Sequence, residues 1–218
     1  MRNYALIPAK ERSSRCHNKN WRDFTGGYSL VDFAVKTTPE GIFDTVIVST
    51  DKKGYSVPKG VSAHLRGKEL AGEDSSVMDL IKVIIKEYGM RDSDYLWLLN
   101  PTSPFRSLKD YREISQLIRE ERPKAVISVT GVSPFIWKGD RPLFPTSGKR
   151  PNTQDFKKQY AVENGMFYIM NVGYFRRRSS WYGNGTMLYE QKRLESLVDI
   201  NTEEDFKEAK KIAKRRAA

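Results

Sequence analysis

The chain has 218 residues and carries 38 Lys and Arg against 27 Asp and Glu, a formal net charge of +11. A chain of this length buries about 70 to 75% of its unfolded surface, and its positive charge favours nucleotides, acidic sugars, nucleic acid or anionic membranes as partners. The longest apolar run is far below the roughly 20 residues that cross a bilayer, and no secretory segment opens the chain, so we expect a cytoplasmic protein without a membrane partner.

Strand-like runs alternate with helix-length amphipathic runs, which predicts an α/β fold with a mainly parallel central sheet and helices on both faces. We expect one domain over residues 1–218. The fourth and fifth strands are the most apolar and should be central. The predicted strands are Tyr4 to Ile7, Thr45 to Ser49, Ser62 to Leu65, Tyr95 to Leu99, Ala125 to Val129 and Met166 to Met170.

Three helices are expected from apolar stripes at helical spacing. Ser76 to Tyr88 places Val77, Leu80, Ile81, Ile84 and Ile85 on one side, and Ser107 to Glu121 places Tyr111, Ile114, Leu117 and Ile118 on one side. The second helix opens with a capping box, Ser107 to Asp110. The third starts near Asn201 or Thr202 and turns Phe206, Ala209 and Ile212 inward.

The first strand runs directly into a loop with four cations: Lys10, Arg12, Arg15 and Lys19. Phosphates are usually held at the carboxyl end of the first strand of such a sheet, so this loop is a candidate polyanion site. The alternative is a solvated charged loop. Cys16 is the single cysteine, which excludes an internal disulfide, and nothing in the sequence activates it as a nucleophile.

A second candidate site is the turn Asn100 to Arg106, where Pro101 and Pro104 fix the backbone around an amide and two hydroxyl groups. Asn100, Thr102 and Ser103 could therefore be preorganised to bind a flat polar base. The alternative is a strand-to-helix turn in which Ser103 or Ser107 only caps the following helix.

A third candidate lies at Val198 to Thr202, where a short alternating strand would put Asp199 and Asn201 on one side. Oxygen ligands in this arrangement suit Mg²⁺ held by one carboxylate and by substrate phosphates. The alternative makes Asn201 a helix cap. Asp51, after the second strand, is a further carboxylate at a strand end, with a turn residue as its alternative.

Residues 134 to about 160 change to Pro, Gly, Lys, Arg and Asn with scattered aromatics and no clear period. A segment of this length outside the sheet is usually functional. The basic residues near the end, Lys210 to Arg216, are read as the exposed face and last turn of a helix, so we do not expect a nucleic-acid partner.

Six stretches in order resemble the cytidylyltransferases that activate acidic sugars, the CMP-N-acylneuraminate synthetase family, with the CMP-Kdo synthetases as more distant relatives. The stretches are Ile7-Pro8-Ala9-Lys10 with Lys19-Asn20, Ile47 to Asp51, Leu65-Arg66 with Glu69 to Ala71, Leu98 to Arg106, Glu163 to Ile169, and Asp199 to Thr202 with Asp205. The resemblance covers nearly the whole chain.

The resemblance implies transfer of CMP from CTP to an acidic 2-keto-3-deoxy sugar, with Mg²⁺ as cofactor and a homodimer arm at residues 134–160. It implies catalytic roles for Lys10, Lys19 and Asp199, and a metal held by Asp199 and Asn201. The residues implied in nucleotide binding are Ala9, Lys10, Arg12, Ser13, Asn20, Arg66, Ser75 and Ser76. Those implied in substrate binding are Asn100, Thr102, Ser103, Gln154 and Asn164.

Several positions depart from the family pattern. Lys10 stands for Arg, Ser14 for Lys, Asn100 for Gln and Asn201 for the second metal carboxylate, while Glu11 and Arg12 replace small residues. Two alternatives therefore stay open: a nucleotidyltransferase for another sugar or nucleotide, and a degenerate member that binds a nucleotide or RNA without catalysis.

Overall fold

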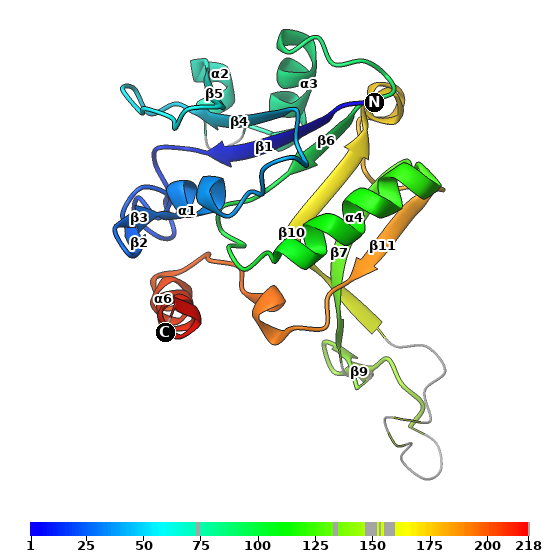
Figure 1. Cartoon of the computed structure of the whole chain (residues 1–218). Helices are drawn as coiled ribbons and strands as arrows, with labels where there is room; N and C mark the ends of the chain where they lie inside the picture. Colours follow the sequence, from blue (N-terminus) through cyan, green and yellow to red (C-terminus); the bar gives the residue numbers. More distant parts are fainter. Residues whose placement is uncertain (73–74, 133–134, 147–151, 153, 155–159, 218) are drawn as a thin grey trace.

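The computed structural model describes residues 1–218 apart from 73–74, 133–134, 147–151, 153, 155–159 and 218. Its main feature is a seven-stranded sheet in the order β11-β7-β10-β6-β1-β4-β5 (Figure 1). All neighbours are parallel except β10, which is antiparallel to both β6 and β7. The predicted α/β class with a mainly parallel sheet is confirmed.

The strands of the sheet are β1 (Asn3–Ala9), β4 (Thr45–Thr50), β5 (Val61–Leu65), β6 (Tyr95–Leu98), β7 (Ala125–Val132), β10 (Tyr160–Asn171) and β11 (Thr186–Glu190). Short pairs form β2 (Asp23–Thr25) with β3 (Tyr28–Ser29), and β8 (Trp137–Lys138) with β9 (Arg141–Pro142). The helices are α1 (Leu30–Lys36), α2 (Lys68–Ala71), α3 (Val77–Glu87), α4 (Leu108–Glu121), α5 (Val172–Arg178), the 3₁₀ helix η2 (Leu194–Leu197) and α6 (Glu203–Ala217).

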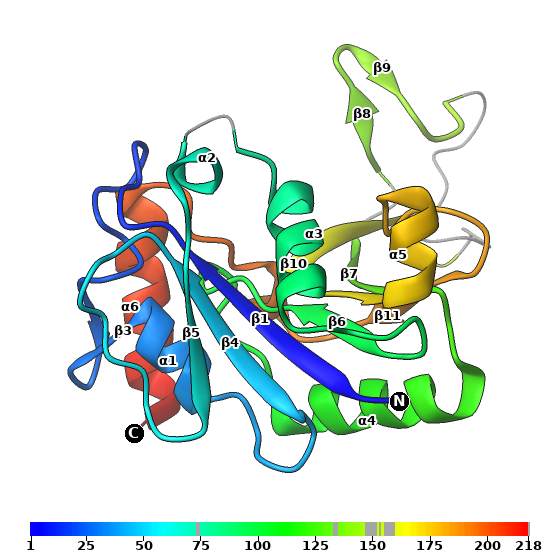
Figure 2. The ribbon, with the colours of Figure 1, turned by 90° about the horizontal axis from the view of Figure 1, so that it is seen from above.

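Helices cover both faces of the sheet, as predicted. Figure 2 shows α4 on one side and α3 and α5 on the other. One buried cluster joins the sheet to α1, α4 and α6 through Leu30, Tyr111 and Phe206, and the second joins it to α3 and α5 through Ile81 and Phe175. Burial of these apolar stripes is the main stabilising term of such a fold.

The predicted helices match the structure to within one residue at most ends. The Ser107–Asp110 capping box forms, with the Ser107 hydroxyl accepting from the Asp110 amide and the Asp110 carboxylate accepting from the Ser107 amide. Thr202 is the residue that caps α6, since its hydroxyl accepts from the Asp205 amide and its own amide donates to Asp205. Lys214, Arg215 and Arg216 occupy the last turn of α6, where cations oppose the helix dipole.

Two predictions about strands are wrong, and a third is confirmed as a strand but with bounds that are too short. β6 is central, but the fifth predicted strand, now β7, is second from an edge, because only β11 lies beyond it in the sheet. The predicted strand Met166 to Met170 is the end of a 12-residue antiparallel strand with an irregular register between Glu163 and Tyr168. Residues 198–201 form no strand but follow η2 in irregular backbone.

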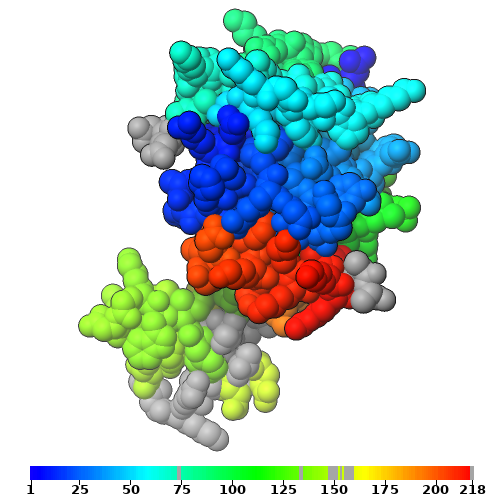
Figure 3. Space-filling model, turned by 90° about the vertical axis from the view of Figure 1, so that its left-hand side faces the viewer, coloured from blue at the N-terminus to red at the C-terminus, as the bar shows by residue number. Residues whose placement is uncertain are grey.

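The long segment expected at 134–160 leaves the sheet between β7 and β10, and its described part carries β8 and β9 and projects from the body of the molecule (Figure 3). Its predicted limits Pro134 and Gln159 lie outside the described residues. Among the residues that the structure describes, no helix is long and apolar enough to cross a membrane.

Candidate functional site

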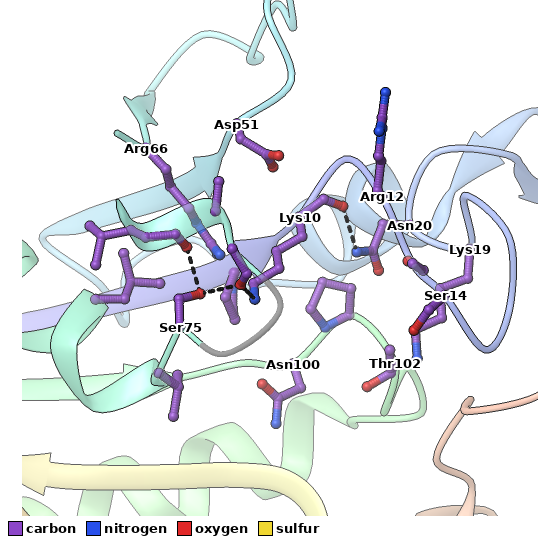
Figure 4. Close-up of a pocket in the computed structure, with 18 of the residues that line it drawn as sticks. Lys10, Arg12, Ser14, Lys19, Asn20, Asp51, Arg66, Ser75, Asn100 and Thr102 are labelled. Atoms are coloured by element: carbon purple, nitrogen blue, oxygen red, sulfur yellow. Dashed lines mark hydrogen bonds between the residues drawn. The ribbon is translucent and has the colours of Figure 1, made fainter. Parts of the chain in front are cut away.

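A cavity of about 680 Å³ opens at the carboxyl ends of β1, β4, β5 and β6. In open parallel sheets this is the edge where ligands bind. Four chain segments line it, and Figure 4 shows how their side chains converge. Ten of the site residues predicted from the sequence line this cavity: Lys10, Arg12, Ser13, Lys19, Asn20, Arg66, Ser75, Ser76, Asn100 and Thr102.

The loop after β1 is folded back on the carbonyl oxygen of Lys10. Asn20 Nδ2 and Trp21 Nε1 each donate to that oxygen at 3.1 Å, and the Glu11 amide donates to Asp51 Oδ1 at 2.7 Å. Asp51 thus anchors the loop as well as lining the cavity. Asn20 Oδ1 is buried without a partner among the described residues. These hydrogen bonds fix the conformation of the loop, so it is not simply a solvated charged segment.

Lys10 crosses the cavity. Its ammonium group donates to the carbonyl of Gly72 at 2.5 Å, and Ser75 Oγ donates to the same oxygen at 2.8 Å and to the carbonyl of Leu70 at 2.9 Å. The first loop and the segment before α3 are therefore joined across the opening (Figure 4). Arg12 is exposed and extends away from these side chains.

Ser76 serves as the N-cap of α3, where its hydroxyl accepts from the Met78 amide at 3.1 Å. The cavity therefore lies at the positive end of this helix dipole, which favours an anion. Val77 and Leu80 from the same helix, with Leu70 and Ala71, add an apolar wall that the sequence interpretation did not assign to the site.

Arg66 lies at the end of β5 and is only 8% exposed. Its Nε donates to Ser49 Oγ at 2.9 Å and its Nη2 donates to the Ser49 carbonyl at 3.0 Å. Burial lowers the pKa of Arg66 to about 10, while the nearby Asp51 carboxylate opposes that shift. Arg66 therefore stays charged at neutral pH and its guanidinium has one defined orientation.

Lys19 joins the cavity to the segment before α6. Its ammonium group donates to the carbonyl of Ile200, and Arg15 Nη2 donates to Asn201 Oδ1 at 3.2 Å. Burial lowers the pKa of Lys19, and the carboxylate of Asp199 opposes that shift. Asp199 and Asn201 do not line the cavity, but they lie beside two of its cations.

Asp199 and Asn201 contact each other even though the predicted strand is absent. Asn201 Nδ2 donates to Asp199 Oδ2 at 2.7 Å, which leaves Asp199 Oδ1 without a hydrogen-bond partner in the described part of the chain. No group of three or more His, Cys, Asp or Glu suited to a metal ion exists among those residues. One exposed carboxylate beside two cations fits a metal held jointly with phosphates, and does not form an all-protein cage.

The turn after β6 brings Asn100 and Thr102 to the cavity but not Ser103. Ser103 is buried and its hydroxyl faces Gly165, where an added Cβ would lie 2.6 Å from Ser103 Oγ. Gly165 also has φ +73°, so both the backbone and the close approach require glycine there. Asn100 Nδ2 points to the carbonyl of Gly165 at 3.5 Å.

Three other predicted residues lie away from the cavity. Ala9 is fully buried in β1, and Gln154 is exposed on the long segment. Asn164 is buried, where its amide contacts Ser128 at 2.6 Å and Thr130 and Gln191 at 2.9 Å. In this arrangement Asn164 braces the irregular part of β10, and its predicted contact with a sugar remains a prediction.

The family model described as "Cytidylyltransferase" matches residues 4–218. The chain is 26% identical to an N-acylneuraminate cytidylyltransferase of Streptococcus agalactiae, over 94% of this chain and 52% of that protein. It is 28% identical to the CMP-N,N'-diacetyllegionaminic acid synthase of Legionella pneumophila, over 97% of this chain and 96% of that protein. The chain thus spans about half the length of most curated relatives it matches.

Two solved structures share the fold. One is a CMP:2-keto-3-deoxy-manno-octonic acid synthetase complexed with CTP, with a TM-score of 0.68, 14% identity, and coverage of 99% of this chain and 100% of that one. The other is the 2-C-methyl-D-erythritol 4-phosphate cytidylyltransferase of Francisella tularensis, with a TM-score of 0.64, 13% identity and coverage of 96% and 98%. With the family model matching almost the whole chain, this protein belongs to the cytidylyltransferase family.

Proposed function

We propose that this chain transfers CMP from CTP to the anomeric hydroxyl of an acidic 2-keto-3-deoxy sugar and releases pyrophosphate. The observation that carries the proposal is that Lys10 and Lys19, from the loop after β1, and Arg66, from the end of β5, line one cavity at the carboxyl edge of the sheet. A triphosphate is the ligand class that matches this charge. The nonulosonic-acid activities named for the relatives support the choice of acceptor.

In the proposed reaction the anomeric oxygen forms a bond to the α-phosphorus, the bond from that phosphorus to the bridging oxygen breaks, and pyrophosphate leaves with that electron pair. The hydroxyl proton passes to solvent, since no residue is assigned as general base. Lys10 and Lys19 hold the phosphates in line and neutralise the charge that grows on the leaving oxygens. Arg66 and the apolar wall of α3 hold the nucleoside end.

Asp199, with Asn201 beside it, would hold Mg²⁺ together with phosphate oxygens. The ion, when bound, supplies further charge neutralisation at the phosphates. Asn201 in place of a second carboxylate makes this a weaker site than one with two acidic ligands, because a neutral amide attracts the ion less. A cytoplasmic place of action fits the proposal, since CTP is made and used there.

The test is release of pyrophosphate from CTP and Mg²⁺ by purified protein, with a panel of nonulosonic and octulosonic acids as acceptors. Release that depends on one of these acids supports the proposal. Silence across the panel overturns it. Calorimetry with CTP, UTP and GTP separates it from a nucleotidyltransferase of another specificity, and salt-sensitive RNA binding without turnover would favour the degenerate member.

We also propose a homodimer in which the arm, residues 134–160, contacts a second copy. Its described part exposes Trp137 and Leu143, and β10 next to it exposes Tyr160 and Val162. Large apolar side chains gathered on a projecting segment favour burial against a partner. Light scattering should give twice the monomer mass, and Trp137→Ser with Leu143→Ser should lower it. A monomeric wild-type protein would contradict the dimer.

A further inference from the structure

A chain of buried polar groups lies behind Arg66, on the side away from the cavity opening. Ser49 is fully buried in β4, and His64, its register neighbour in β5, is 7% exposed. Ser49 Oγ lies 2.8 Å from His64 Nδ1, and His64 Nε2 lies 3.3 Å from a carboxylate oxygen of Glu87 at the end of α3. Ser49, His64 and Glu87 are all outside the cavity lining.

The directions of these hydrogen bonds follow from the chemistry of the groups. Arg66 Nε can only donate, so Ser49 Oγ accepts from it. The Glu87 carboxylate can only accept, so the neutral His64 ring carries its proton on Nε2, and the Ser49 hydroxyl donates to the free Nδ1. An imidazole that accepts at Nδ1 carries its proton on Nε2, which faces Glu87.

Two further facts agree with a neutral imidazole. Burial lowers the pKa of His64, and the nearby Arg66 charge lowers it further against the opposing Glu87 carboxylate. Glu87 is half-exposed, and its carboxylate stabilises the His64 tautomer that is protonated on Nε2. Arg66 therefore donates to Ser49, Ser49 donates to His64, and His64 donates to Glu87. These hydrogen bonds run from the cavity to the surface of the molecule.

This set decides where the Arg66 guanidinium lies. Its Nε and Nη2 are both used on Ser49, and its Nη1 has no hydrogen-bond partner among the described residues. Nη1 is thus the group that Arg66 offers to a ligand. Without an acceptor at His64, the Ser49 hydroxyl can turn its hydrogen toward other groups, and the long Arg66 side chain loses one of its two anchors.

We propose that His64 is a positioning residue for nucleotide binding, which acts through the Ser49 hydroxyl to hold Arg66 against the nucleoside end of the substrate. The inference rests on the proposed function, and it extends that function by a residue that touches neither nucleotide nor acceptor. A merely structural His64 would affect folding stability without distinguishing the nucleoside end of the ligand from its phosphates.

Two substitutions of His64 test its two ring nitrogens separately. The amide oxygen of His64→Asn stands near the Nδ1 position and keeps an acceptor for Ser49. The amide of His64→Gln stands near Nε2 and loses that acceptor. Calorimetry should show CTP binding weakened about tenfold in His64→Gln and in Ser49→Ala, a loss of one hydrogen-bond contribution, and changed less than about threefold in His64→Asn.

Inorganic pyrophosphate is the matched ligand, because it lacks the nucleoside. Its dissociation constant should be the same in wild type and in all the variants. The double variant Ser49→Ala with His64→Gln should bind CTP no more weakly than either single variant, since both remove the same contact. Leu65→Asn is the control substitution, because Leu65 is 62% exposed on the same strand.

Nitrogen-15 NMR of the wild-type imidazoles gives a readout that is independent of every variant, and the chain has only two histidines to assign. The proton of His64 should be on Nε2; a proton on Nδ1 would overturn the inference. Unchanged CTP binding by His64→Gln, or equal weakening of CTP and pyrophosphate, would also overturn it. Wild-type protein that binds no CTP would instead refute the proposed function, while the tautomer would still report on His64.

Discussion

Arg106 Nη2 donates to the backbone carbonyl of Asn100 at 2.6 Å and ties the start of the Asn100 turn to its end. The same guanidinium donates from Nε to the carbonyl of Met166 at 2.6 Å. Arg106 is buried, and no carboxylate pairs with it in the described part of the chain. Its guanidinium therefore supports the turn, which lines the cavity, and joins that turn to β10, and burial lowers the pKa of Arg106.

Arg106→Met should destabilise the protein, because two buried carbonyl groups lose their donor. The expected loss in the free energy of unfolding is about 2 kcal/mol or more. Urea unfolding measures it. Arg112→Met, at an exposed position on α4, the helix that follows the turn, is the control and should cost less than about 0.5 kcal/mol. Equal stability of the two variants would contradict the role given to Arg106.

Lys19→Met should lower kcat by about 10²- to 10³-fold, the cost of removing one charge that stabilises developing negative charge. The fold should remain, as judged by an unchanged circular dichroism spectrum. Lys59→Met, an exposed lysine outside the cavity, should leave kcat unchanged. If Lys19→Met keeps full activity, Lys19 only links the loop to Ile200.

The lowered pKa of Lys19 also predicts a pH dependence. The charged amine is the active form, so kcat/KM should fall as the pH rises through that lowered pKa, below the ordinary lysine value of 10.5. Lys19→Arg keeps the charge at higher pH and should move this alkaline limit upward. An alkaline limit at the same pH in both proteins would assign it to another group.

Asp199→Asn should raise the Mg²⁺ concentration needed for half-maximal activity by about 10-fold or more, since the only carboxylate of the proposed metal site is lost. Asn201→Asp should lower it, because a second negative ligand is restored next to Asp199. Titration of pyrophosphate release with Mg²⁺ measures both. Glu204→Gln, an exposed acid on α6, is the control. If no variant alters the Mg²⁺ concentration needed for half-maximal activity, the metal is bound elsewhere.

Asp205 makes α6 sensitive to acid. The backbone amides of Asn201 and Thr202 donate to its carboxylate and lower its pKa. Its contribution to stability is therefore complete above the ordinary aspartate pKa of 3.8 and is lost as the pH falls through the lowered value in the folded protein. Thermal unfolding of Asp205→Asn should show a lower Tm near neutral pH and a smaller drop on acidification. An identical acid profile would contradict this assignment.

The parts of the fold that could be predicted are those set by local sequence. The stripes of α3 and α4 and the box from Ser107 to Asp110 depend on residues within one helix. β11 was missed because Thr186 to Glu190 lacks clear alternation and becomes a strand only by pairing with β7. The antiparallel direction of β10 was also missed, since an apolar run carries no information on direction.

The candidate site also has parts that local sequence predicts and parts that it does not. The cations Lys10 and Lys19 stand out in the sequence because they cluster in one loop after an apolar strand. The contact of Lys19 with Ile200, the bracing role of Asn164 and the chain behind Arg66 each join distant segments, so no local pattern indicates them. His64 in particular reads as one polar residue in an edge strand.

The loop after β1 is completed by residues that are synthesised long after it. Lys19 contacts Ile200, and Arg22 forms an ion pair with Glu203 at 2.7 Å, each across 181 positions of sequence. During synthesis the ribosome must therefore add residues 200–203 before the loop after β1 can gain these supports. A nascent chain halted before residue 200 would contain every cavity-lining side chain and still lack a finished site.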